Sequence, residues 1–246
     1  MLGERYFAAV AEVLAAVAEG QSEAIGCAAD LIATSIAQGG VVHLFGSGHS
    51  QMLCQEVFYR AGGLAAVNAN LDDGLGLAGG AARASQVERM EGYGSVALSQ
   101  QDLRSGEVMV VISTSGRNPV PVDAALEARR RGLFVVALTS VAYSQAAPSR
   151  HSSGMTLMDV ADVVIDNLSL PGDAVLTHAE VPVKFGPTST AVGAAILQAL
   201  MAEVVERLVQ RNVEPPVFLS GNLDGADAHN AALVERYRGR AGRLGL

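Results

Sequence analysis

The stretch 107-EVMVVISTSGRNPVPVD-123 joins an apolar run to a hydroxyl-rich turn and then to an amphipathic segment. The run at 108–112 is rich in β-branched residues, which is typical of a buried strand, and Pro119 stands where a helix would begin. The positive end of that helix dipole would face the turn, where glycine leaves the backbone amides unshielded. We therefore expect an anion site, and phosphate is the anion that fits it best. The turn contains Ser113, Thr114, Ser115, Gly116 and Asn118.

A second segment repeats this design. Residues 41–50 read VVHLFGSGHS, an apolar strand followed by small and hydroxyl-bearing residues, and a helical stretch follows at 51–61. Serine, threonine and asparagine also cap helices, so capping alone remains the alternative for either loop. Two loops of one design in one chain favour binding. The second loop consists of Gly46, Ser47, Gly48, His49 and Ser50.

The composition and the order of segments predict an α/β protein. Half of the 246 residues are hydrophobic, and apolar strands are expected near residues 41, 64, 108, 133 and 163, joined mostly by helices. Such connections imply right-handed crossovers and a parallel sheet that is covered on both faces. Ligands bind beyond the carboxyl ends of the strands in these sheets. Both hydroxyl loops lie at such ends, so we expect them to face one site.

Charge and hydropathy argue against several classes of partner. The formal net charge is −8, which disfavours nucleic acid and anionic membranes, and no segment has about 18 uninterrupted apolar residues. Cys27 and Cys54 have no paired spacing, so we expect core thiols in a reducing cytosol. His151, His178 and Glu180 match no recognised metal spacing. We expect a cytoplasmic protein with no metal and no cofactor.

Further segments complete the expected architecture. Helices at 3–38 precede the first strand and are free to pack on a partner subunit. Residues 68–80, rich in Asn, Asp and Gly, predict a loop, a helix follows at 81–91, and the longest helix opens at 186–190 and runs to about residue 210. A loop and helix at 212–246 end in a run of arginines that predicts a solvated tail.

The two loops together resemble the sugar isomerase (SIS) domain family. The matching motifs are Gly-x-Gly-x-Ser at 46–50 and Ser-x-Ser-Gly-x-Asn at 113–118, and the likeness extends over about residues 35–210. The resemblance is closest to sugar isomerase-like or phosphoheptose isomerase-like members. It implies one SIS domain over 1–246 with a flavodoxin-like, three-layer α/β/α fold around a five-stranded parallel sheet. It also implies a homodimer or homotetramer whose site lies at the subunit interface.

The resemblance assigns the binding residues. The hydroxyls and amide of the two loops would hold the phosphate of a phosphorylated sugar, His49 would hydrogen-bond ligand oxygens, and two residues at the start of the longest helix would line the sugar. The phosphate residues are Ser47, Ser50, Ser113, Ser115 and Asn118, supported by Gly46, Gly48, Thr114 and Gly116, and the sugar residues are Thr188 and Ser189.

An aldose–ketose isomerase also needs a carboxylate base, because it moves a proton between C1 and C2 through an enediol. Glu56 lies six residues after Ser50, where SIS isomerases commonly place a functional glutamate. Glu88 and Glu91 would be neighbours on the helix at 81–91. His229, in a polar loop near the C-terminus, is the candidate for ring opening. For each of these side chains, a solvated surface residue or a capped turn is the alternative.

Muramic acid phosphate etherases show a related pattern, with Ala-Gly-Gly and then Glu-Gly ahead of the second loop. Residues 78–80 and Glu91-Gly92 match it, so Glu91 is an acid or base candidate for either reaction. The leading hypothesis is a sugar-phosphate isomerase that uses Glu56, Glu91 and His229. The alternatives are an etherase-type lyase acting on an amino-sugar phosphate and a non-catalytic sugar-phosphate sensor.

Overall fold

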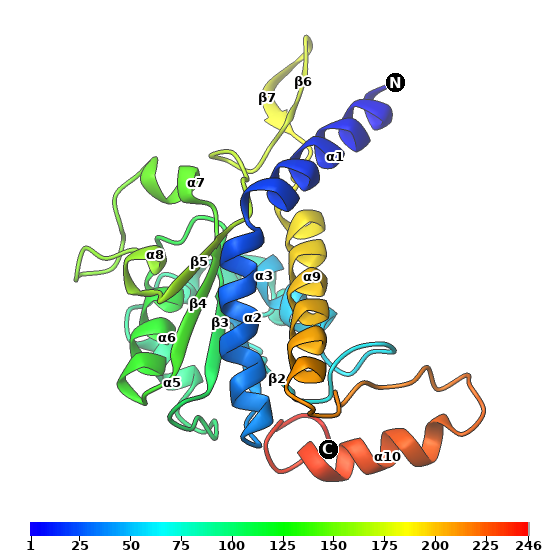
Figure 1. Ribbon diagram of the computed structural model, residues 1–246. Helices are drawn as coiled ribbons and strands as arrows, with labels where there is room; N and C mark the ends of the chain where they lie inside the picture. The colour runs from blue at the N-terminus through cyan, green and yellow to red at the C-terminus, as the bar shows by residue number, and fades with distance from the viewer. Residues whose placement is uncertain (246) are drawn as a thin grey trace.

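A computed structural model describes residues 1–245 and shows a three-layer α/β/α architecture (Figure 1). The central sheet has five strands in the order β2-β1-β3-β4-β5, all parallel, with Val42 opposite both Val67 and Val108. This order is that of flavodoxin-like folds, so the predicted fold class is confirmed. The strands are β1 (Val42–Gly46), β2 (Val67–Asn70), β3 (Val108–Ile112), β4 (Phe134–Thr139) and β5 (Val163–Asp166).

Alternate residues of the strands face two separate cores. In β3, Val108, Val110 and Ile112 belong to one apolar cluster, whereas Met109 and Val111 belong to the other. Strands that are buried on both faces read as continuous apolar runs, which explains why 108–112 lacks polar alternation. The first core is covered by α1 (Leu2–Gly20), α2 (Ser22–Ala37), α3 (His49–Glu56) and α9 (Ser189–Gln210), and the second by α4 (Ala81–Val87), α5 (Tyr93–Ala97), α6 (Pro119–Arg130) and α8 (Leu157–Val160).

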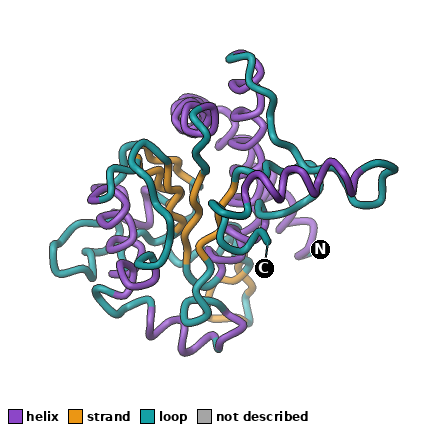
Figure 2. Tube along the Cα trace, turned by 90° about the horizontal axis from the view of Figure 1, so that it is seen from below, coloured by secondary structure: helices purple, strands orange, loops and turns teal. Residues whose placement is uncertain are grey.

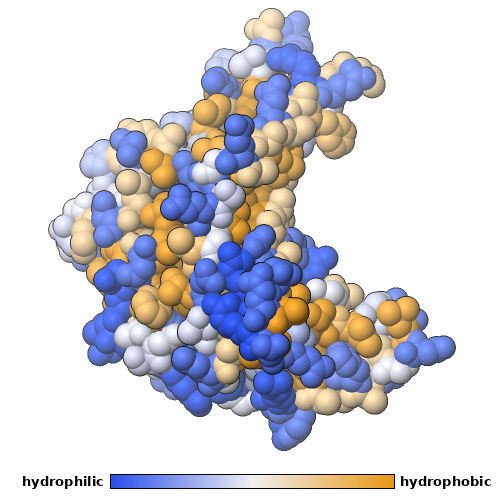
Figure 3. Space-filling model, viewed as in Figure 1, coloured by the Kyte–Doolittle hydropathy of each residue, from blue (hydrophilic) through white to orange (hydrophobic). Residues whose placement is uncertain are grey.

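Two arms project from this body on the side of α9. One consists of α1 with the antiparallel hairpin of β6 (Leu176–His178) and β7 (Val181–Phe185), and the other is α10 (Ala226–Tyr237) (Figure 1). Figure 2 shows the second arm extending away from the sheet. The space-filling view shows a hollow between the arms, with apolar side chains on its wall (Figure 3). The remaining helical segments are η1 (Leu77–Gly79) and α7 (Val141–Gln145).

The second strand differs from the prediction. Strand β2 begins at Val67, and Leu64 forms an isolated antiparallel bridge with Val217 instead. Asn68 and Asn70, predicted to lie in a loop, are buried in β2. Asparagine is rare in strands, but here its amides have partners: Asn70 donates to the Leu44 carbonyl at 3.0 Å, and the Asn68 amide nitrogen lies 3.1 Å from a ring nitrogen of His43.

Three helix boundaries also differ. Helix α3 ends at Glu56 rather than near residue 61, and α4 ends at Val87, so Glu88 and Glu91 do not share a helix. Helix α9 starts at Ser189 with Thr188 as its N-cap, two residues after Pro187, the proline of the segment that was expected to open the helix. Boundaries are the weakest part of any prediction from sequence periodicity.

The predicted solvated tail is wrong for part of its length: Arg236, Arg238 and Arg243 are exposed, but apolar residues between them are buried. The side chain of Arg240 is only 11% exposed, because it pairs with Asp102 and with the buried Glu107, and Arg243 donates to the Leu71 carbonyl at 2.9 Å. Of the two expected core thiols, Cys54 is buried and Cys27 is exposed. Burial raises the pKa of the Cys54 thiol, which keeps it protonated.

Within residues 1–245, no helix is long and apolar enough to cross a membrane. The same residues contain no group of three or more His, Cys, Asp or Glu side chains arranged to hold a metal ion.

Candidate functional site

The loop after β1 turns tightly because two of its residues are glycines. A Cβ on Gly46 would lie 2.7 Å from the carbonyl carbon and oxygen of Ser50, so no side chain fits there. Gly48 caps α3 with φ = 54°, a left-handed conformation that glycine adopts without strain. Its amide donates to the Leu75 carbonyl at 2.8 Å. The glycines therefore serve the turn itself and present Ser47, His49 and Ser50 at its rim.

The loop after β3 is held by contacts from the chain that follows β4. Gly116 has φ = 62°, and a Cβ there would lie 2.5 Å from the hydroxyl oxygen of Ser144. That hydroxyl donates to the Ser115 carbonyl at 2.9 Å, and the Ser140 amide donates to the Thr114 carbonyl at 3.0 Å. The loop is thus fixed through its backbone, while its side chains are left to face outward.

Four hydroxyls of the two loops have no protein partner among residues 1–245. They belong to Ser47, Ser50, Thr114 and Ser115, whereas the Ser113 hydroxyl accepts a bond from the Gly116 amide at 3.3 Å. A hydroxyl can both donate and accept, so four unpaired hydroxyls beside each other suit a ligand with several oxygens.

The two loops meet at one cavity of about 220 Å³, which we call the loop cavity. It lies beyond the carboxyl ends of β1 and β3, as parallel sheets of this kind favour. Eight of the twelve predicted binding residues line it: Ser47, His49, Ser50, Ser113, Thr114, Ser115, Asn118 and Ser189. The other four, Gly46, Gly48, Gly116 and Thr188, do not line it; the three glycines shape the loops, and Thr188 is buried as the cap of α9.

Helix dipoles contribute positive potential to the loop cavity. The first residues of α3 and the cap of α6, Asn118, border it, and neither helix has an acidic residue in its first turn. The N-terminus of α9 is different, because the Asp173 carboxylate accepts from the amides of Thr188 and Ser189 at 3.1 and 3.0 Å. The end of α3 is therefore open to an anion, and the end of α9 is not. At α6 the dipole remains but few amides do, because Pro119 and Pro121 have no N–H and the Val120 amide donates to the Glu88 carbonyl at 3.2 Å.

Few charged side chains reach this cavity. No lysine or arginine lines it, although Arg150 donates to the side-chain oxygen of Asn118 at 2.8 Å from outside. Two carboxylates do line it. Asp173 is occupied by α9 and by the hydroxyl of Ser189 at 2.5 Å, whereas Glu88 makes no side-chain hydrogen bond with any of residues 1–245. Glu88 is the carboxylate that is free to exchange a proton with a bound ligand.

The three residues predicted to be catalytic lie outside the loop cavity of their own chain. Glu56, at the end of α3, pairs with Arg60 on the surface. Glu91 accepts from the Ser152 amide at 3.0 Å, and hydrogen bonds from Ser152 lower the pKa of its carboxyl group. His229 lies on the α10 arm, where a ring nitrogen is 2.8 Å from the Val217 carbonyl oxygen.

The motifs missed five residues that line the cavity: Leu53, Glu88, Tyr143, Asp173 and Thr190. For Glu88 a signal existed, since Glu88 and Glu91 both stand near the end of a predicted helix, but the Glu-Gly pattern favoured Glu91. Asp173 comes from a loop and Tyr143 from α7, and neither segment has a recognisable motif.

Comparison with protein families agrees with this geometry. A family model described as "SIS domain" matches residues 5–140, more than half of the chain. The chain belongs to the SIS domain family. A protein of the same kind from Halalkalibacterium halodurans, UPF0309 protein BH0227, is 48% identical over 241 residues, which cover 98% of this chain and 96% of that protein.

Solved SIS-type structures share the fold at low sequence identity. Phosphoheptose isomerase GmhA from Neisseria gonorrhoeae is 18% identical with a TM-score of 0.56, and the match covers 84% of this chain and all of that one. The Vibrio vulnificus NanR protein complexed with ManNAc-6P is 14% identical with a TM-score of 0.50, covering 86% of this chain and 65% of that one. At these identities the likeness is one of fold.

Proposed function

We propose that this SIS domain binds a phosphorylated sugar in the loop cavity, with the phosphate on the two hydroxyl loops. The observation that carries the proposal is the meeting of four hydroxyls, on Ser47, Ser50, Thr114 and Ser115, beside the N-terminus of α3 and the cap of α6. None of the four has a hydrogen-bond partner among residues 1–245. Hydroxyls and helix N-termini together hold phosphate without a cation. Membership of the SIS family and the GmhA and NanR neighbours support the same ligand class.

The proposed reaction is aldose–ketose isomerisation. Glu88 would remove the proton from C2 of the open-chain aldose, forming a cis-enediol, and return it to C1 while the hydroxyl proton moves between the two oxygens. The reaction is internally balanced, since C2 is oxidised as C1 is reduced. Its support is that Glu88 is the carboxylate in the cavity without a partner among residues 1–245.

A second copy of the chain would occupy the hollow between the arms. Along the outer side of α9, the exposed residues are mostly alanine and valine, including Ala191, Ala195, Ala199, Ala202 and Val209. A surface of this kind at the base of a hollow suits another helix, so a homodimer or homotetramer is proposed (Figure 3). In that assembly, Glu56, Glu91 and His229 would act as acid-base groups at the loop cavity of a neighbouring subunit, since they lie outside the loop cavity of their own chain.

Two other functions would use the same cavity. An etherase-type lyase would also take the C2 proton with Glu88 but expel a substituent from C3, and the Ala-Gly-Gly at 78–80 favours it. A sensor would bind the ligand and transform nothing, and the ligand named with NanR supports that alternative. Binding without solvent exchange at C2 would select the sensor.

A thermal-shift screen against heptose, hexosamine and muramic acid phosphates tests the binding. We expect a melting temperature that rises with ligand concentration in the wild type and rises less in Ser115→Ala. Ser85→Ala is the matched control, because that exposed hydroxyl bonds only to the Ala81 carbonyl on α4. No shift with any of these phosphosugars would contradict the proposal.

A further inference from the structure

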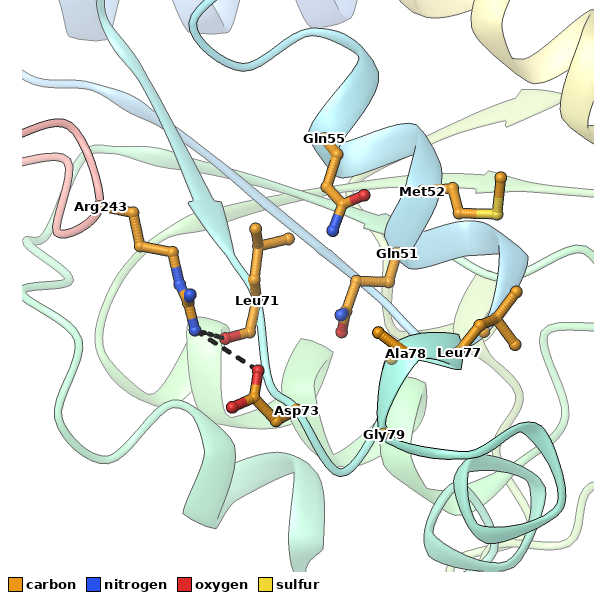
Figure 4. A pocket seen from close by; sticks show the side chains of 11 residues that line it. Gln51, Met52, Gln55, Leu71, Asp73, Leu77, Ala78, Gly79 and Arg243 are labelled. Carbon is orange, nitrogen blue, oxygen red and sulfur yellow. Dashed lines mark hydrogen bonds and ion pairs between the residues drawn. The ribbon is translucent and has the colours of Figure 1, made fainter.

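A second and larger cavity, of about 460 Å³, lies on another side of α3. We call it the glutamine cavity. Its size is within the range of small-molecule sites. None of its lining residues carries a hydroxyl, so its chemistry differs from that of the loop cavity. Figure 4 shows Gln51 and Gln55 reaching into it from α3, with Leu71 and Asp73 facing them and Arg243 arriving from the C-terminal tail.

Gln51 is the central polar group of this cavity. Its side chain is only 6% exposed, and its amide oxygen accepts from the Asp72 amide at 3.3 Å. Its amide nitrogen makes no hydrogen bond with any of residues 1–245 and points into the cavity (Figure 4). Because this nitrogen is accessible from the cavity, it can donate to an acceptor atom of a bound ligand.

The Gln51 amide lies close to the backbone of Gly76. A Cβ on Gly76 would lie 2.6 Å from the Gln51 side-chain nitrogen, although the backbone of Gly76, with φ = −81°, would accept any residue. An alanine here would therefore displace the end of the Gln51 side chain and leave the turn unchanged.

The other walls complement a flat heterocycle. Gln55 stands one turn after Gln51, so two amides share one helix face and together offer donors and acceptors to the edge of a ring. Met52, Leu71 and Leu77 provide apolar surface for its faces.

The mouth of the cavity carries one charge of each sign. The carboxylate of Asp73 is 95% exposed, and Arg243 lies 3.9 Å from it, too far for a hydrogen bond. Arg243 uses one nitrogen for the Leu71 carbonyl and keeps its other donors, which suit a phosphate, while Asp73 can accept from two ribose hydroxyls.

We propose that the glutamine cavity binds a nucleoside 5′-monophosphate: its base against the Gln51 and Gln55 amides, its ribose hydroxyls on Asp73 and its phosphate on Arg243. Gly48 borders this cavity while Ser47, His49 and Ser50 border the loop cavity. The nucleotide site is thus adjacent to the proposed phosphosugar site and separate from it.

Isothermal titration of the full chain with AMP, GMP, CMP and UMP tests the proposal, with the four nucleosides and ribose 5-phosphate for comparison. We expect one-to-one binding of at least one nucleotide, weakened about tenfold or more in Gly76→Ala, Asp73→Asn and Arg243→Gln. Ser115→Ala should leave this binding unchanged, which separates it from phosphosugar binding. Asp224→Asn and Arg130→Gln, both exposed and outside the lining of this cavity, are the matched controls.

Two results would overturn the proposal. One is the absence of binding by any of the four nucleotides at millimolar concentration. The other is binding that Ser115→Ala abolishes and Gly76→Ala leaves intact, because the nucleotide phosphate would then lie on the hydroxyl loops. Asp73 is on the surface, so Asp73→Asn keeps the test valid even if Gly76→Ala fails to fold.

Discussion

The hydroxyl of Ser144 donates to the carbonyl oxygen of Ser115 across 2.9 Å, and this bond ties α7 to the loop after β3. Ser144 is 3% exposed and lies outside the residues that line the loop cavity. Its role is therefore to fix the loop backbone, so that the side chain of Ser115 faces the ligand.

Ser144→Ala should weaken phosphosugar binding without removing a ligand contact. The bond to Ser115 and a longer one, 3.4 Å, between the Ser144 and Thr139 hydroxyls are lost, so we expect a stability loss of about 1–2 kcal/mol and a several-fold rise in Kd. Calorimetry and urea unfolding measure both effects. Ser99→Ala is the control, because it removes an exposed hydroxyl that donates a hydrogen bond to the Val96 carbonyl. An unchanged Kd for Ser144→Ala would show that the loop holds its shape without this bond.

Glu88→Gln should separate binding from chemistry. The amide keeps the size of the side chain but cannot accept the C2 proton, so solvent deuterium exchange should slow by about 10²- to 10⁴-fold while Kd changes little. NMR of the recovered sugar phosphate follows the exchange. Glu56→Gln and Glu91→Gln provide the comparison, and a loss of exchange in either one with none in Glu88→Gln would assign the base to that residue.

Glu107 should make stability depend on pH in the acid range. Burial raises the pKa of its carboxyl group, but hydrogen bonds from His43, from the Arg104 amide and from Arg240 outweigh burial and hold the pKa at about 2, below its ordinary 4.5. A lowered pKa stabilises the folded state above the unfolded value, so about 3 kcal/mol of stability should be lost as the pH falls from about 4.5 to about 2.

Denaturant unfolding of Glu107→Gln at pH 7 and at pH 3 measures this contribution. The variant should be less stable than the wild type at pH 7 and should lose less on acidification. Glu235→Gln, whose carboxylate pairs with Arg238 on the surface, should behave as the wild type does. If Glu107→Gln and the wild type lose the same stability on acidification, the Glu107 carboxylate is excluded as the source of the pH dependence.

Ala195→Arg should disrupt the proposed assembly. Ala195 is exposed in the middle of α9, and an arginine there would place a charge in the hollow where a second copy is expected. Light scattering after size-exclusion chromatography should show the wild type as a dimer or tetramer and the variant as smaller species. Ala142→Arg, on α7 at the other side of the molecule, is the control (Figure 1). A wild-type monomer would contradict the assembly.

Local signals in the sequence were sufficient for the sheet and for the two loops. The apolar run at 108–112 and the glycines at 46 and 116 act through their own backbone and burial, which a pattern can reveal. The fold class, which depends on such signals, was therefore predicted correctly.

The features that the sequence patterns missed depend on contacts between residues far apart in the chain. Asn68 is stable in a buried strand because its amide nitrogen lies within hydrogen-bond distance of a His43 ring nitrogen. The Arg240 side chain is largely shielded from solvent because it pairs with Glu107, 133 residues earlier in the chain. Glu88 reaches the cavity only because α4 ends at Val87, a boundary that no capping residue marks. None of these pairings leaves a trace in local spacing.

The most direct test of the central claim is calorimetric titration of one sugar phosphate, and of the same sugar without its phosphate, into the wild type and Ser115→Ala. The account predicts that the phosphate ester binds to the wild type, that the free sugar binds at least about tenfold more weakly, and that Ser115→Ala loses most of this difference. Equal affinity for the ester and the free sugar, or an unchanged preference in Ser115→Ala, would contradict a phosphate site on the two hydroxyl loops.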